Sequence, residues 1–187
     1  MTVGVLAFHG DFAEHLEILR ELRVTALEIR SLDDLKNVDR LIIPGGESTV
    51  MSRFLEETGM AQEIRRRVKN GKFPVYGTCA GAILLAEKVT GKNAPRSLGL
   101  MKITIDRNAY GTQLQSFGTE LGVHGIHGKV PVCFIRAPII TKIGMGVQVL
   151  ATHKGNPVLV RQGNLLAGTF HPEVNGETAI HEMFLSM

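Results

Sequence analysis

The chain contains 187 residues, which is the size of one domain or of two small ones. Hydrophobic residues make up 44% of it and charged residues 21%, an ordinary globular composition that excludes a disordered or fibrous protein. The formal net charge of +3 is too small to argue for nucleic acid or an anionic membrane surface as a partner.

Cysteine usage and the first residues indicate the compartment. The two cysteines, Cys79 and Cys133, are too few to staple a chain of this length and fit a reducing environment. The opening MTVGVLAFHGDF lacks the basic segment and long apolar core of a signal peptide, and no apolar run approaches the ~20 residues that span a bilayer. We therefore expect a soluble cytoplasmic protein, folded as a single domain over residues 1–187.

Strand and helix patterns alternate through the first half of the chain. Runs of β-forming residues predict strands at 2–8, 24–29, 39–43 and 73–76. Apolar residues at helical spacing predict helices at 12–22, 49–57, 61–69 and 80–88. Such alternation with short turns favours a parallel sheet covered on both faces.

The second half carries short β-type runs with no long helix between them. These runs are at 98–105, 130–137, 148–153, 157–161 and 165–170, and a closing helix is expected near 176–185. Antiparallel additions to an α/β core would explain this pattern. Because active groups in open α/β sheets gather at the carboxyl ends of strands, those ends are where chemistry is expected.

A nucleophile elbow follows the strand at 73–76. The sequence Gly77-Thr78-Cys79-Ala80-Gly81 is the G-x-nucleophile-x-G pattern with a cysteine in the central position. The glycines suit a turn too tight for side chains, and a helix N-terminus beside Cys79 favours its thiolate form. The pattern predicts Cys79 as a nucleophile, whereas Cys133, inside an apolar run, is interpreted as core packing.

A cysteine nucleophile needs a base and a group that orients the base. His171 follows the strand at 165–170 and begins the sequence His171-Pro172-Glu173. Residues two apart in an extended segment point to the same side, so Glu173 can fix the imidazole tautomer while the other nitrogen faces Cys79. Three residues alone are a weak signal, but together with the elbow they predict a Cys-His-Glu triad.

The sequence Pro44-Gly45-Gly46-Glu47-Ser48-Thr49 follows the third strand. It lacks the spacing and the lysine of a P-loop. Consecutive glycines after a strand can instead aim backbone N–H groups at an oxyanion, so Gly46 and Ala80 are predicted to form an oxyanion hole.

The other histidines carry weaker signals. His124 and His127 lie three apart, but they lack the further ligands of a zinc site, so no metal is expected. His15 and His181 fall in helical patterns and are interpreted as solvated or as satisfied core residues.

In these segments the chain resembles the class I (triad) glutamine amidotransferases, and among them the glutaminase subfamily of pyridoxal 5′-phosphate synthase. The similar segments are VLAFHGDFAEH, LIIPGGESTVMSRF, PVYGTCAGAILLA, Ile105-Asp106-Arg107-Asn108, Phe134-Ile135-Arg136-Ala137-Pro138 and FHPE, in the order of that subfamily. The chain departs at His9, where the family usually has Gln. The resemblance implies an α/β fold of flavodoxin-like type, a three-layer sandwich with a mostly parallel central sheet and antiparallel additions in the second half.

The resemblance also implies the reaction and the roles of residues. Glutamine would be hydrolysed to glutamate and ammonia, with Cys79 as nucleophile, His171 as base and Glu173 as its orienter. It implies that L-glutamine is held by Gly46, Glu47, Ser48, Arg107, Ile135 and Arg136. Ammonia would pass to a separate pyridoxal 5′-phosphate synthase subunit, and no cofactor or metal would be required.

Two alternatives stay open from sequence. One is the glutaminase of another biosynthetic pathway, such as that of histidine or nucleotides. The other is a cysteine-containing α/β stress or chaperone-like protein without glutaminase activity. In that class the elbow cysteine is commonly followed by His, whereas here Ala80 follows it.

Overall fold

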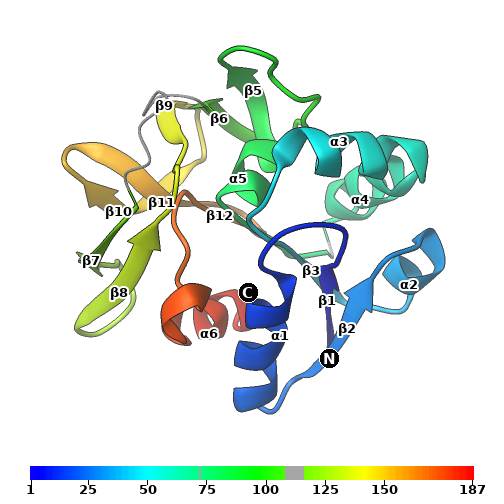
Figure 1. Cartoon of the computed structure of the whole chain (residues 1–187), viewed down its shortest axis with the longest axis horizontal. Coiled ribbons are helices and arrows are strands. Elements are labelled where there is room, and N and C mark those ends of the chain that lie inside the picture. The colour runs from blue at the N-terminus through cyan, green and yellow to red at the C-terminus, as the bar shows by residue number, and fades with distance from the viewer. Residues whose placement is uncertain (72, 108–115) are drawn as a thin grey trace.

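The computed structural model describes residues 1–71, 73–107 and 116–187, and a sheet of seven strands forms its centre (Figure 1). The strand order is β10-β11-β12-β4-β3-β1-β2. In chain order these strands are β1 (Thr2–Leu6), β2 (Thr25–Ile29), β3 (Arg40–Ile43), β4 (Val75–Thr78), β10 (Gln148–His153), β11 (Asn156–Gln162) and β12 (Leu165–Gly168). Asn108, part of one similar segment, lies outside the described residues.

The sheet is parallel over most of its width and antiparallel at one edge. Strands β12, β4, β3, β1 and β2 pair in parallel, whereas β11 pairs antiparallel with both β10 and β12. The antiparallel edge comes from the second half of the chain. The mostly parallel sheet with antiparallel additions is thus confirmed.

Two smaller sheets accompany the main one, and apart from β5 their strands come from the second half of the chain. One contains β5 (Ala86–Thr90), β6 (Met101–Asp106) and β9 (Ile139–Ile143). The other is the antiparallel pair of β7 (Phe117–Gly122) and β8 (Lys129–Phe134).

Helices cover both faces of the main sheet (Figure 1). They are α1 (Phe12–Glu21), α2 (Leu32–Lys36), α3 (Ser48–Glu57), α4 (Met60–Lys69), α5 (Ala80–Leu85), the 3₁₀ turn η1 (Glu173–Asn175) and α6 (Ala179–Leu185). Successive strand residues serve opposite cores: Leu41 and Ile43 pack with α2 to α5, whereas Ile42 packs with α1 and α6. This alternation explains the continuous apolar runs of the inner strands and gives the three layers.

The structure corrects the helix predicted over 80–88. Helix α5 ends at Leu85, and Ala86–Thr90 forms β5, which pairs in parallel with β6. All six residues of α5 are buried, so its apolar run carries no helical periodicity that would mark its end. Helix α2 and strands β7 and β9 were not predicted.

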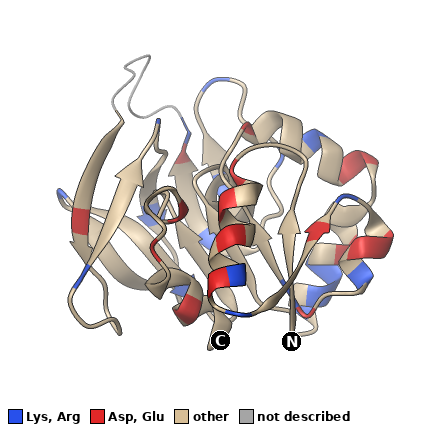
Figure 2. Cartoon of the chain, turned by 60° about the horizontal axis from the view of Figure 1, so that its bottom comes forward, with Lys and Arg blue, Asp and Glu red and all other residues tan. Residues whose placement is uncertain are grey.

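No helix in the described part of the chain is long and apolar enough to cross a membrane. Acidic and basic residues are interspersed on the helices (Figure 2). On α4, for example, Glu63 is followed by Arg66 and the two side chains form an ion pair. Opposite charges are thus paired locally on this helix.

Candidate active site

Cys79 lies in the turn that joins β4 to α5. Its φ of 48° and ψ of −100° are a conformation that non-glycine residues rarely adopt, and such strain is typical of functional turns. The N–H of Cys79 donates to the carbonyl of Gly168, at 2.8 Å, which ties the elbow to the end of β12. A Cβ atom at Gly81 would lie 1.9 Å from the carbonyl oxygen of Ile43, so the elbow requires glycine there.

His171 follows β12 and is fixed by its own main chain. Its N–H donates to the carbonyl of Cys133 at 2.7 Å, and the N–H of Cys133 donates to the carbonyl of His171 at 3.2 Å. Cys133 is half-buried rather than fully buried, so its thiol is only partly core packing and its backbone anchors the histidine.

Two carboxylates approach the same ring nitrogen of His171. Nδ1 lies 2.7 Å from Oε1 of Glu173 and 3.0 Å from Oδ2 of Asp11. Nε2 is therefore the nitrogen left to face Cys79. Burial opposes a charged ring, but hydrogen bonds to Asp11, Cys79 and Glu173 raise the pKa of His171 to about 12. A positively charged imidazolium beside the sulfur is the setting in which a cysteine can act as a nucleophile.

The carboxylates differ in their surroundings. The Glu173 side chain is fully buried, and burial raises its pKa although the hydrogen bond to His171 opposes this shift. The Asp11 side chain is about a third exposed, at 34%, and its hydrogen bond to His171 lowers its pKa. Glu173 is therefore the partner held at short range in a low dielectric, whereas Asp11 is a nearby charge open to solvent.

The glycine loop after β3 packs against the histidine. A Cβ atom at Gly45 would lie 2.3 Å from Cε1 of His171, so glycine lets the loop approach the imidazole closely. Gly46 has a φ of +140°, and the next N–H, that of Glu47, donates to Nδ1 of His9 at 3.2 Å. His9, in the loop after β1, is therefore hydrogen-bonded to the glycine loop directly after the predicted oxyanion donor Gly46.

Glu47 and Arg107 form a second polar group beside this loop. Glu47 caps α3 by accepting from the N–H groups of Thr49 and Val50, and Arg107 lies 3.1 Å from its Oε1. Burial would raise the pKa of Glu47, but these hydrogen bonds and Arg107 lower it overall. Arg107 also donates to Thr49 and to the carbonyl of Asn93. An anion and a cation thus stand together, as recognition of a zwitterion requires.

The remaining predicted binding residues occupy two places. Ser48 begins α3 and is buried, beside Glu47. Ile135 follows β8, and its carbonyl oxygen lies 3.9 Å from Sγ of Cys79, so this segment borders the elbow. Arg136 is exposed and adopts a positive φ of 44°.

Sequence reasoning did not single out Asp11 as a site residue. Its signal was its position in the turn His9-Gly10-Asp11 at the carboxyl end of the first strand, the same edge where the elbow and the glycine loop begin. Cys79, His171 and Glu173 are brought together by the adjacent strands β4 and β12 and the segment after β12.

Asp11, His171 and Glu173 also offer three ligand atoms within 4.8 Å of one another, a grouping that could hold a metal ion. The same three residues make the contacts at Nδ1 of His171 described above. A metal there would replace the contacts that orient the imidazole, so the grouping fits a charge-stabilised histidine better than a metal centre.

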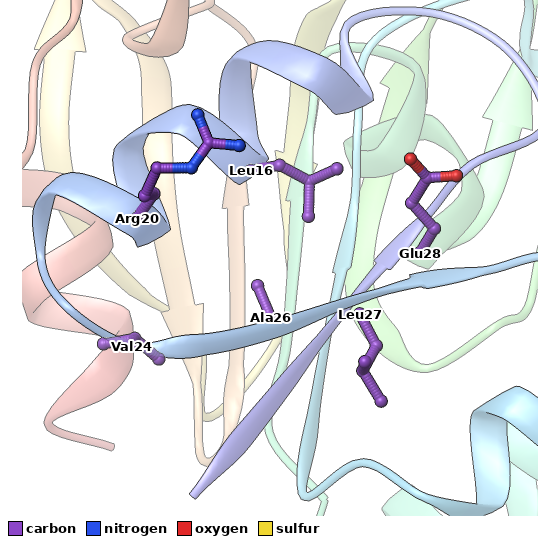
Figure 3. Close-up of a pocket in the computed structure, with 6 residues that line it drawn as sticks. All are labelled: Leu16, Arg20, Val24, Ala26, Leu27 and Glu28. Carbon is purple, nitrogen blue, oxygen red and sulfur yellow. The ribbon is translucent and has the colours of Figure 1, made fainter.

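A surface pocket of about 360 Å³ lies between α1 and the edge strand β2. Figure 3 shows the residues that line it: Leu16, Arg20, Val24, Ala26, Leu27 and Glu28. None of them is a predicted site residue. The candidate site is therefore defined by its side-chain geometry and not by this pocket.

Comparison with solved structures identifies the class of protein. A PurLQS structure from Thermotoga maritima matches with a TM-score of 0.71 and 17% identity over 99% of this chain and 97% of that one, which shows the fold. A crystal structure titled glutamine amidotransferase matches with a TM-score of 0.93 and 44% identity over 98% of this chain and 97% of that one. The fold is the flavodoxin-like fold of the class I glutamine amidotransferases.

Comparison of sequences identifies the family. The model of the SNO glutamine amidotransferase family matches residues 5–187, and the chain belongs to this family. A protein of Pseudothermotoga lettingae named pyridoxal 5′-phosphate synthase subunit PdxT is 47% identical over all of this chain and 95% of its own length. One of the same name from Thermus thermophilus is 45% identical, over all of this chain and 97% of its own length.

Proposed function

We propose that this chain hydrolyses L-glutamine to L-glutamate and ammonia as the glutaminase subunit of a pyridoxal 5′-phosphate synthase. One observation carries the chemistry: Nδ1 of His171 is held by Glu173 at 2.7 Å, which leaves Nε2 to serve Cys79 on the elbow. The names of the full-length relatives support the assignment to this synthase. The two free cysteines fit the cytoplasmic location we expect.

The reaction follows from the charged pair. The Cys79 thiolate attacks the carboxamide carbon, and the carbonyl oxygen becomes an oxyanion facing the N–H groups of Gly46 and Ala80. Ala80 is the first residue of α5, where N–H groups have no intrahelical acceptor. Nε2–H of His171 gives its proton to the departing nitrogen, and ammonia leaves a glutamyl thioester.

Water completes the cycle. Neutral His171 takes a proton from water, whose oxygen attacks the thioester carbon. Glutamate leaves, and the thiolate and imidazolium are restored. Glu173 stays ionised and stabilises the ring each time it becomes charged. The chain's own residues carry every step, so the proposal includes no metal or organic cofactor.

Two sets of residues beside Cys79 are proposed to bind glutamine. One is the glycine loop with Arg107, and the other is the segment at Ile135 and Arg136. Arginine suits the α-carboxylate, and both Arg107 and Arg136 are proposed to contribute. Gly46, Glu47 and Ser48 line the substrate on the side of the glycine loop. The segment at Ile135, whose carbonyl lies 3.9 Å from Sγ, lines it on the other side.

The test is ammonia release from glutamine, measured for the chain alone and with the synthase subunit added. We expect a rise of at least about tenfold with the subunit, since one oxyanion donor is typically worth about 10²–10³ in kcat. Formation of pyridoxal 5′-phosphate from a pentose phosphate, a triose phosphate and glutamine identifies the pathway. Glutaminase activity without that product would point to another biosynthetic partner.

A further inference from the structure

A cluster of buried polar side chains lies beside Glu173. His15 of α1 and His181 of α6 meet there, with 2.8 Å between Nδ1 of His15 and Nε2 of His181. Nε2 of His15 lies 3.2 Å from Oγ1 of Thr78 and 3.6 Å from Oε1 of Glu173. Helices α1 and α6 lie on the same face of the sheet (Figure 1), which brings together residues 166 positions apart.

Burial disfavours the charged form of both rings of this cluster. His15 and His181 are fully buried, and burial lowers the pKa of each, that of His181 to about 4. Tyr76 packs edge-on against both rings and adds no charge at neutral pH. The charged groups on this side are therefore Glu173 and, beyond it, His171 and Asp11.

Neutral rings restrict how the protons can be arranged. A neutral imidazole has one N–H and one acceptor nitrogen, so one ring of the pair must donate to the other. If His15 donated from Nδ1, its Nε2 lone pair would face the Glu173 carboxylate. If His181 donates from Nε2, the Nε2–H of His15 points toward Thr78 and Glu173. The second arrangement places a proton, not a lone pair, against a buried anion, which favours it electrostatically, and it leaves on Nδ1 of His181 a lone pair that has no hydrogen-bond partner within the described residues.

Glu173 depends on this contact because of how it is held. Its Oε1 faces both His171 and His15, whereas its Oε2 is buried and makes no hydrogen bond within the described part of the chain. With Oε2 unpaired, the position of the carboxylate depends on the contacts made by Oε1. His15 is the second group at Oε1.

We propose that His15 is a positioning residue that holds the Glu173 carboxylate against His171, with His181 fixing the tautomer of His15. The proposal rests on the proposed glutaminase function, in which Glu173 orients the base. It predicts that the contact made by Nε2 of His15, and not the bulk of the ring, controls the reactivity of Cys79.

Two amide substitutions separate the nitrogens of His15. In His15→Gln the amide occupies the place of Nε2 and can still donate toward Glu173. In His15→Asn the amide occupies the place of Nδ1 and can meet only His181. We expect kcat with the synthase subunit present to stay within about threefold of wild type in His15→Gln. It should fall at least about tenfold in His15→Asn, with KM changed less than about twofold in both.

A second readout does not require glutaminase activity. The rate at which iodoacetamide alkylates Cys79 at neutral pH, followed by peptide mapping, reports the thiolate directly. We expect alkylation to slow in His15→Asn and not in His15→Gln. If wild type fails to hydrolyse glutamine, the proposed function fails, yet the alkylation comparison still tests His15.

Equal kcat values and equal alkylation rates in the two variants would overturn the proposal, and so would a larger loss in His15→Gln. Either result would mean that the contact of His15 with Glu173 does not matter, and that its contact with His181 serves only the structure. If either variant at position 15 fails to fold, kcat and the alkylation rate are compared between His181→Gln and His181→Asn instead. His181→Gln keeps a donor at the place of Nε2, so it should retain alkylation and kcat better than His181→Asn. The absence of that order would equally overturn the proposal.

Discussion

Oδ2 of Asp11 lies 3.0 Å from Nδ1 of His171, the nitrogen that Glu173 contacts at 2.7 Å. One N–H cannot be aimed fully at two acceptors, so the carboxylates share it. The more exposed Asp11 contributes charge, whereas the buried Glu173 contributes both charge and orientation.

We expect the two carboxylates to respond differently to amide substitution. Asp11→Asn removes a charge but leaves the ring oriented, so kcat should fall less than about tenfold. Glu173→Gln should cost at least about 100-fold, because it removes the buried orienter. NMR titration of the imidazole should show a lowered pKa of His171 in Asp11→Asn. A larger loss from Asp11→Asn than from Glu173→Gln would contradict the assignment of the triad.

Cys79 and Cys133 should be distinguishable by chemistry. Cys79→Ala and Cys79→Ser should abolish glutamine hydrolysis without unfolding, since the elbow accommodates either side chain. Cys133→Ala should stay within about threefold of wild type, because Cys133 holds His171 through its backbone and not its thiol. A glutamine-like chloroketone should label Cys79, and peptide mapping that finds the label mainly on Cys133 would reverse the assignment.

His9 should control the glycine loop through Nδ1. His9→Phe keeps the ring volume but removes the acceptor for the N–H of Glu47, and His9→Ala removes both. We expect both to reduce the stimulation of glutaminase by the synthase subunit about tenfold, with less effect on complex formation measured by titration. Full stimulation in His9→Phe would show that the hydrogen bond is dispensable.

The elbow should tolerate no side chain at Gly81. Gly81→Ala places Cβ against the carbonyl of Ile43, which belongs to a buried strand and cannot move aside. We expect its free energy of unfolding, measured in urea, to fall by about 3 kcal/mol or more. Gly122→Ala is the matched control, because nothing lies within 4 Å of a Cβ atom there, and it should change that energy by less than about 1 kcal/mol.

The free energy of unfolding should fall in mild acid, because the buried His181 is harder to protonate in the folded chain than in the unfolded one. The pKa of His181 is about 4 in the native state, below the ordinary 6.5, so in this range only the unfolded chain binds the proton. Its contribution is complete above pH 6.5 and is lost as the pH falls toward 4. Between pH 7 and 4.5 the free energy of unfolding of wild type should drop by roughly 2 kcal/mol more than that of His181→Gln. Parallel curves for the two proteins would show that His181 has the same pKa in the folded and the unfolded chain.

Local sequence motifs predicted the strands and turns that carry the residues of the candidate site. The elbow, the glycine loop and His171-Pro172-Glu173 each follow a buried strand, and the rule that parallel strands end at one edge suggests their meeting. The sequence did not reveal that Asp11 shares Nδ1 of His171, because that contact depends on the path of the loop after β1.

Contacts between distant segments account for the rest. His15 and His181 meet only because α1 and α6 cover the same face of the sheet. Strand β5 exists because Ala86–Thr90 pairs with β6, although the residues before it are helical. In both cases the tertiary partner, and not local preference, decides the outcome.

Two main-chain hydrogen bonds between Cys133 and His171 tie the β7–β8 hairpin to the segment that carries the imidazole. Substitutions other than proline leave both bonds in place, so the backbone of His171 can leave its position only if the hairpin detaches from the segment after β12. The amide protons at these two positions should then exchange with solvent at a common rate. Hydrogen-exchange measurements at two backbone sites would thus report how often the main-chain anchor of His171 opens while the rest of the molecule stays folded.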